Sequence, residues 1–154
     1  MPDTEILTSL PTFSDVEAAA KTLRGITVRT PLLESPLLNA EIGGRVLVKP
    51  EMLQRTGSFK FRGASNRIRN LTPEESARGV LAFSSGNHGQ GVAAAAHAAG
   101  VAATLVMPAT APAIKVARCR AWGAEAILHD GDRKSMEARA QALAGERGLV
   151  LIPP

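Results

Sequence analysis

Apolar and polar segments alternate regularly in the second half of the chain. Short apolar runs of strand type cover residues 80–83, 102–107 and 126–128, and another begins at residue 149. Segments of helical character lie between these runs, at residues 87–99, 112–122 and 132–144, and Gly123 and Gly145 are expected to end the last two. Strands that alternate with helices predict a parallel α/β sheet with right-handed crossovers and flanking helices.

The first half of the pattern is mainly helical. A capping box at Ser14 and Glu17 predicts a helix that ends near Gly25. A second, short helix is expected between Ser35, which precedes a proline, and Gly43. Further elements are expected as a strand at residues 45–48 and as helices that begin at Lys60 and Thr72.

Composition and charge limit the classes of protein to which this chain is expected to belong. The 154 residues suffice for one domain with a real core. The net charge of +4 comes from 18 basic and 14 acidic residues that are mixed along the chain, and tyrosine is absent. Without a basic stripe or an aromatic stacking platform, nucleic-acid binding is not expected. Cys119 is the only cysteine, so no disulfide framework is possible within the chain, and we expect this side chain to pack in the interior.

The amino-terminal segment adds a prediction about location. Residues 1–10 carry acids and no long apolar run, so neither a signal peptide nor a membrane span is expected. The lone cysteine fits a reducing compartment, and the sequence therefore predicts a cytoplasmic protein.

The segment from Thr56 to Ala64, with the sequence TGSFKFRGA, places a lysine at the start of a predicted helix. The positive end of the helix dipole and partial burial would disfavour the ammonium form of Lys60. A neutral lysine amine is a nucleophile that reacts with carbonyl groups. An exposed lysine that extends from an amphipathic helix is the alternative, and this segment alone leaves it open.

A second candidate site follows the strand at residues 80–83. The sequence SSGNHGQG, Ser84 to Gly91, reads as a tight turn that opens a helix. Unpaired N–H groups at a helix start bind anions, and the serine, asparagine and histidine side chains add hydrogen-bonding groups. Ligands of parallel sheets bind beyond the carboxyl ends of the strands, which is where this turn lies. An ordinary turn whose polar residues cap the helix is the alternative.

The two motifs together resemble one family. SFKFRGA followed downstream by SSGNHGQ is similar to the pyridoxal-phosphate enzymes of the threonine dehydratase and serine racemase group, which have the tryptophan synthase β-like fold. The flanking residues Thr30-Pro31-Leu32, Val48-Lys49-Pro50-Glu51 and Val106-Met107-Pro108 fit the same family. The resemblance runs from about Leu23 to the last residue.

The resemblance implies roles for individual residues. Lys60 matches the lysine that holds pyridoxal 5'-phosphate covalently, Phe59 the aromatic against its ring, and Asn87 the asparagine that binds its ring hydroxyl. Ser85 matches the serine that acts as acid or base opposite the lysine in racemases. The loop expected to bind the substrate carboxylate comprises Ser84, Ser85, Gly86, Asn87 and His88.

The resemblance also implies a domain organisation. We expect residues 1–71 to form the amino-terminal part of a large cofactor domain that includes the Lys60 helix, and residues 72–152 to form a small α/β domain. The phosphate-binding glycine run of the family would lie in later sequence, so the chain is expected to be the amino-terminal half of an enzyme. Apolar residues of the first part would then be partly exposed: Leu32, Leu33, Leu37, Leu38, Phe61 and Ile68.

The predicted function is β-elimination of threonine or serine to a 2-keto acid and ammonia. A serine or aspartate racemase is the second prediction, and a non-catalytic α/β module that binds an anion or a partner chain is the third. As a whole protein, the enzyme is expected to be a cytoplasmic homo-oligomer with a small amino acid as substrate. His129, Asp130 and Asp132 cluster at a strand end, but we expect helix caps there rather than a metal site.

Overall fold

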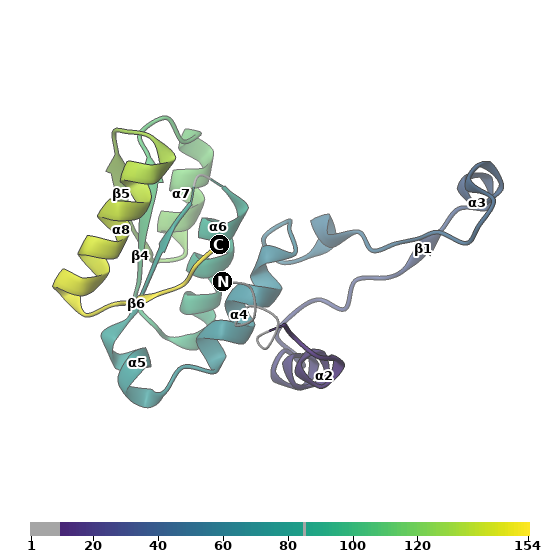
Figure 1. Cartoon of the computed structure of the whole chain (residues 1–154), viewed down its shortest axis with the longest axis horizontal. Helices are drawn as coiled ribbons and strands as arrows, with labels where there is room; N and C mark the ends of the chain where they lie inside the picture. Colours follow the sequence, from purple (N-terminus) through teal and green to yellow (C-terminus); the bar gives the residue numbers. More distant parts are fainter. Residues whose placement is uncertain (1–9, 85) are drawn as a thin grey trace, which may run out of the picture.

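The computed structural model describes residues 10–84 and 86–154, so the prediction for Ser85 lies outside the described residues. Its core is a four-stranded parallel sheet with the strand order β5-β4-β3-β6 (Figure 1). The strands are β3 (Val80–Phe83), β4 (Ala103–Pro108), β5 (Glu125–His129) and β6 (Val150–Leu151). Val80 is in register with Ala103 of β4 and with Val150 of β6. The predicted parallel α/β sheet is confirmed.

Helices cover both faces of this sheet. The helices of this part are α5 (Pro73–Arg78), α6 (Asn87–Ala99), α7 (Ala113–Ala121) and α8 (Arg133–Arg147). Val80 and Ala82 of β3 pack in a core with α6 and α7, whereas Leu81 and Phe83 pack in a second core with α8. Because successive residues of a strand point to opposite faces, the uninterrupted apolar run of β3 serves both cores. Cys119 is fully buried in the first core, and burial raises the pKa of its thiol.

Helix α4 (Lys60–Arg69) contributes to the first core, because it packs along α6. Phe61 is 1% exposed and Ile68 is 2% exposed, so the expectation that these two side chains would be partly exposed is wrong. The physical reason is the small-residue surface of α6, whose glycines and alanines let the apolar stripe of α4 approach closely. The proposed boundary between residues 71 and 72 remains a prediction.

The segment before α4 extends away from the sheet (Figure 1). It contains α2 (Phe13–Thr22), β1 (Leu33–Glu34), α3 (Pro36–Ile42), β2 (Leu47–Val48) and the 3-10 turn η1 (Glu51–Leu53). β1 pairs antiparallel with β2, and Arg45 forms an ion pair with Glu34 beside them. Leu32, Leu33 and Leu37 are exposed, as expected, and Leu38 is half-buried.

Several element boundaries differ from the sequence predictions. Helix α2 is capped by Thr12 and Asp15, which precede the predicted pair of Ser14 and Glu17 in the chain. Helix α8 continues through Gly145 and ends at Gly148, whose φ of 67° is left-handed. The predicted strand at residues 45–48 is reduced to its last two residues, and β1 was not predicted.

The remaining helix starts agree with the sequence. Ser35 caps α3, and Thr72 with Glu75 forms the capping box of α5. The left-handed Gly43 ends α3, as predicted. None of the helices in residues 10–84 and 86–154 is long and apolar enough to cross a membrane.

Candidate active site

Lys60 is the first residue of α4, directly after Phe59 at the N-cap position. The preceding loop turns at Gly57, which has a φ of +73°. The Lys60 side chain is half-buried, and its Nζ lies 5.5 Å from the ring centroid of Phe59. Phe59 itself is 61% exposed, so its ring is available to cover a planar ligand beside the amine.

The surroundings of Lys60 form a pocket of about 310 Å³. Gly63, Ala64 and Arg67 of α4 line this pocket, and so does His88 of α6. The structure therefore brings together Lys60 from the first motif and His88 from the second, whereas Phe59, Ser84 and Asn87 do not line this pocket.

Gly91 makes this juxtaposition possible. A Cβ on Gly91 would lie 3.0 Å from the carbonyl carbon of Lys60 and 3.2 Å from the Phe61 nitrogen. These distances are tighter than nine in ten real Cβ contacts, so a side chain at this position would require α4 and α6 to shift apart by a few tenths of an ångström. Sequence reasoning missed this role, although a glycine inside an otherwise alanine-rich helix was a signal for close backbone approach.

Buried hydroxyl groups precede Lys60. Thr56 Oγ1 and Ser58 Oγ are buried, and neither has a hydrogen-bond partner among the described residues. Burying a hydroxyl without a partner costs free energy, so most buried hydroxyls in proteins are hydrogen-bonded. Ser65 Oγ, inside α4, is a third such group. The loop before Lys60 thus offers two hydroxyls that a polar ligand could satisfy.

The turn after β3 is held by local bonds. The Gly86 N–H donates to Ser84 Oγ over 3.1 Å, and Gly86 is the N-cap of α6. Asn87, the first residue of α6, is exposed and has no side-chain bond to a described residue. The Nζ of Lys115 would be 3.3 Å from a Cβ on Gly86, so α7 places a cation beside this turn. No local pattern predicted Lys115, because its proximity depends on tertiary packing.

His88 has a structural bond of its own. Its ring is buried, and Nε2 lies 3.0 Å from the carbonyl oxygen of Ile152. Burial lowers the pKa of His88, the Ile152 carbonyl opposes this, and the charge of Lys60 adds to the lowering. A neutral ring that donates from Nε2 fits both observations, and it ties the start of α6 to the segment after β6.

Arg62 takes a role that the sequence did not predict. Arg62 Nε donates to Glu51 Oε2 over 2.7 Å, and its terminal nitrogens donate to Thr27, Val28 and Thr30. The Arg62 guanidinium lowers the pKa of Glu51 to about 2 against the opposing effect of burial. These bonds fasten the preceding segment to α4, the helix that begins with the candidate lysine.

In the cluster at the end of β5, Asp132 is the N-cap of α8. Asp132 Oδ1 accepts the Ser135 N–H over 2.7 Å, and His129 Nε2 lies 3.0 Å from Ser135 Oγ. Within the part of the chain that the structure describes, no group of three or more histidine, cysteine or acidic side chains is arranged to hold a metal ion.

The residues around Lys60 fit pyridoxal phosphate by their chemistry. The cofactor has an aldehyde for an amine, a flat ring for an aromatic face, and a ring hydroxyl for an amide. Lys60 and Phe59 would supply the amine and the aromatic face from the start of α4. Asn87, the first residue of α6, would supply the amide, and it is not among the residues that line the pocket of Lys60. The orphaned hydroxyls of Thr56 and Ser58 add polar partners in the loop before α4.

Comparison with known proteins agrees with this chemistry. Residues 23–154 match the family described as pyridoxal-phosphate dependent enzyme. Because the match covers most of the chain, the protein belongs to this family of pyridoxal-phosphate enzymes.

Individual relatives include ammonia-lyases and racemases. The chain is 46% identical over 144 residues to an L-threo-3-hydroxyaspartate ammonia-lyase of Pseudomonas sp, covering 94% of this chain and 45% of that protein. A threonine deaminase structure from T.th. has a TM-score of 0.81 and 46% identity, over 94% of this chain and 45% of the other. A serine racemase structure from Dictyostelium discoideum has a TM-score of 0.86 and 34% identity, over 93% of this chain and 47% of the other. The chain thus spans less than half the length of these relatives.

Proposed function

We propose that the whole protein to which this chain belongs catalyses β-elimination from a β-hydroxy amino acid such as threonine or serine, with a 2-keto acid and ammonia as products. The observation that carries the proposal is the position of Lys60, half-buried at the start of α4 in one pocket with His88. The names of the relatives support the reaction class, since they include a threonine deaminase and a hydroxyaspartate ammonia-lyase.

The chemistry divides between cofactor and chain. When bound, the cofactor acts as an electron sink that acidifies the Cα–H bond of the substrate. The Lys60 amine accepts the Cα proton as general base. The β-hydroxyl then leaves with a proton as water, and the resulting enamine takes up water to give the 2-keto acid and ammonia. The turn at residues 84–88 holds the substrate carboxylate through the start of α6, with Lys115 as a nearby cation.

The proposal has a direct kinetic test. The whole protein, loaded with pyridoxal phosphate, is assayed for keto acid and ammonia from L-threonine and L-serine. Lys60→Ala should abolish turnover because it removes the base and the covalent attachment. Lys21→Ala, a lysine in the last turn of α2, should retain activity. Full activity of Lys60→Ala would contradict the proposal.

A racemase is the second candidate, supported by similarity to serine racemase structures. Lys60 and Ser85 would then exchange the Cα proton on opposite faces. Ser85→Ala should retain most elimination if the protein is a dehydratase, and should abolish interconversion of enantiomers if it is a racemase. Equal and complete loss of both reactions would mean that Ser85 mainly binds the substrate carboxylate.

The family resemblance carries further expectations for the whole protein. Residues 1–71 would contribute to its large cofactor domain and residues 72–152 would form its small domain. A cytoplasmic homo-oligomer remains the expected assembly. A non-catalytic anion-binding or partner-binding role for the isolated polypeptide is the third candidate, supported by the anion-binding character of the α6 start.

A further inference from the structure

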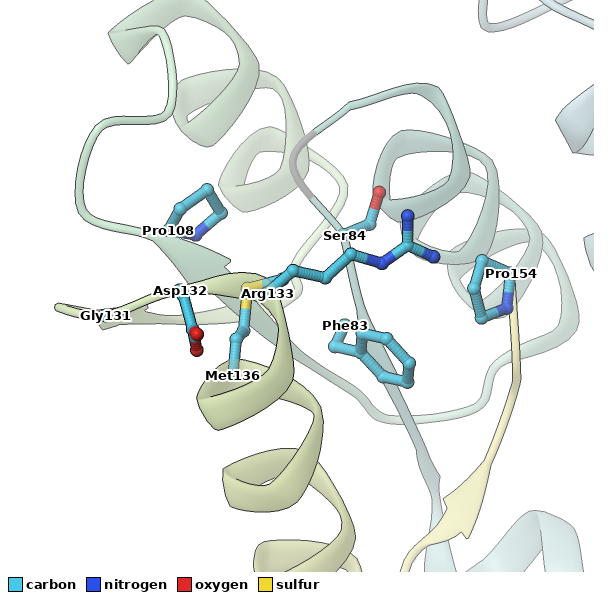
Figure 2. A pocket seen from close by; sticks show the side chains of 8 residues that line it. All are labelled: Phe83, Ser84, Pro108, Gly131, Asp132, Arg133, Met136 and Pro154. Carbon is cyan, nitrogen blue, oxygen red and sulfur yellow. The ribbon is translucent and has the colours of Figure 1, made fainter.

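The two motifs of the candidate site are held in different ways. Ser84 follows β3 and lines a pocket of about 250 Å³ at the carboxyl ends of the strands (Figure 2). Its N–H donates to the carbonyl of Val106 in β4 over 3.0 Å, so the sheet holds this motif. Phe59 and Lys60 instead follow a loop, residues 54–59, that contains no helix or strand. Because a loop places side chains less precisely than a strand does, the position of Lys60 depends on what holds this loop.

Gln54 begins the loop, and its side chain binds the backbone of Val28. The amide Oε1 accepts the Val28 N–H over 2.9 Å, and the amide Nε2 donates to the Val28 carbonyl over 3.0 Å. Oε1 also accepts the N–H of Arg55 over 3.1 Å. Gln54 is only 3% exposed, so water does not compete for these bonds. Two bonds to one residue reproduce the way in which antiparallel strands pair, and they fix both the position and the direction of the amide.

The backbone of Gln54 sets the course of the loop that follows. Its carbonyl accepts the N–H of Gly57 over 2.8 Å, and the left-handed Gly57 closes this turn. The Phe59 carbonyl in turn accepts the N–H of Arg62 over 3.0 Å, in the first turn of α4. The chain from Gln54 to Lys60 is therefore one tight turn that leads directly into α4, and a shift of Gln54 would move both.

The residues on either side of the loop bind the same part of the chain. Arg62 donates to the Val28 carbonyl over 2.9 Å and to Thr30 Oγ1 over 3.3 Å. Glu51, which precedes the loop, accepts the Thr30 hydroxyl over 2.6 Å. Residues 28–30 thus form a support segment to which the loop is bonded before its start, at its start and after its end. Thr30 is 3% exposed, so this contact lies in the interior.

We propose that Gln54 is a positioning residue for Lys60, because its bonds to the support segment hold the loop so that the Lys60 amine and the Phe59 ring meet the cofactor in one orientation. This inference rests on the proposed function, in which Lys60 binds the cofactor and accepts the Cα proton. Gln54 does not line the pocket of Lys60, so it acts through the loop. Without its amide, Glu51 and Arg62 still bond the flanks of the loop to the support segment, but the turn between them is free to move.

The test is spectroscopic and uses the whole protein loaded with pyridoxal phosphate. A cofactor that a chiral site holds in one orientation gives a strong circular dichroism band in the visible range, and a loosely held cofactor gives a weak one. Gln54→Met removes the amide but keeps the length of the side chain, and it should lose most of the ellipticity per bound cofactor. Arg147→Met, which removes a 2.7 Å ion pair with Glu125 between α8 and β5, is the matched control and should keep the ellipticity. Urea unfolding of both variants measures their stability independently.

The kinetics should separate positioning from substrate binding. Gln54→Met should lower kcat for L-threonine about 10- to 100-fold, since a reacting group misplaced by about 1 Å costs up to this factor. It should change KM by less than about threefold, because the turn proposed to hold the substrate carboxylate is held by the sheet. If Gln54→Met does not fold, Gln54→Asn takes its place, because it keeps an amide that is too short to reach Val28 and should show the same loss of ellipticity.

The outcomes distinguish this inference from the proposed function. A folded Gln54→Met or Gln54→Asn variant that is less stable but keeps the full ellipticity and kcat would overturn the inference, because Gln54 would then only stabilise the fold. An equal loss of ellipticity in Arg147→Met would overturn it as well. Ellipticity that depends on Gln54, in a protein without any elimination activity, would instead overturn the proposed reaction and retain the positioning role.

Discussion

Gly91 of α6 lies so close to Lys60 that a Cβ on this glycine would be 3.0 Å from the Lys60 carbonyl carbon. The contact is between backbones, so neither partner can move aside as a flexible side chain would. It fixes the start of α4, and hence Lys60, against α6.

Gly91→Ala should therefore destabilise the protein and displace Lys60. Overpacking costs about 1–3 kcal/mol, and the better helix propensity of alanine offsets about 1 kcal/mol of it. We expect a net loss of up to about 2 kcal/mol in the free energy of urea unfolding, together with weaker binding of pyridoxal phosphate. Gly145→Ala is the matched control, because nothing lies within 4 Å of a Cβ there, and it should stabilise α8 by about 0.5–1 kcal/mol. Equal effects of both substitutions would contradict the close approach.

The ion pair between Glu51 and Arg62 predicts a pH dependence of stability. The pKa of Glu51 falls from the usual 4.5 to about 2 in the folded protein, chiefly through its bonds to Arg62. A depressed carboxyl pKa stabilises the fold fully above the unfolded value of about 4.5, and this stabilisation is lost as the pH falls toward 2. The Glu51 side chain is only 16% exposed, so water screens the ion pair little. We expect the ionised carboxylate to contribute about 2 kcal/mol to the free energy of unfolding at pH 7.

Unfolding of Glu51→Gln by urea at pH 7, 5, 4 and 3 checks this expectation. The variant should be about 2 kcal/mol less stable than the unmodified protein at pH 7, and the difference should shrink below about pH 4.5. Glu146→Gln removes an exposed ion pair with Arg139 and should change stability by less than about 0.5 kcal/mol. A difference for Glu51→Gln that stays constant from pH 7 to pH 3 would show that the ionised carboxylate contributes nothing.

The elements that the sequence predicted well are those with local signals. The caps of α3 and α5, the glycine end of α3 and the apolar run of β3 depend on neighbours in the chain. Gly145 misled the prediction for α8, because a glycine inside a helix costs only about 1 kcal/mol and the packing of Leu143 and Ala144 offsets it.

The candidate site shows the same division. Lys60 and His88 stand in short motifs, and their motifs meet in one pocket. Arg62 bonds to residues that lie 11 to 35 positions away in the chain, and Lys115 of α7 approaches Gly86 at the start of α6. No local sequence pattern encodes these contacts. Phe61 and Ile68 were misjudged for the same reason, since their burial depends on the surface of α6.

Backbone protection should differ sharply along the isolated chain. Residues 29–50 contain only the two-residue strands β1 and β2 and the short helix α3, with Leu37 84% exposed. Buried residues of α4, β3, α6 and β4 form the first core. Hydrogen exchange measured by mass spectrometry should find strong protection in α4, β3, α6 and β4 and little at residues 29–50. Protection that begins only after residue 72 would contradict the packing of α4 on α6.

Borohydride reduction tests most directly whether Lys60 is the residue that binds the cofactor. The whole protein is incubated with pyridoxal phosphate, reduced, digested and mapped by mass spectrometry. The pyridoxyl group should be found on the peptide that contains Lys60, and the label should be lost in Lys60→Ala while Lys21→Ala keeps it. A label on Lys49 or Lys115, with Lys60 unmodified, would contradict this assignment.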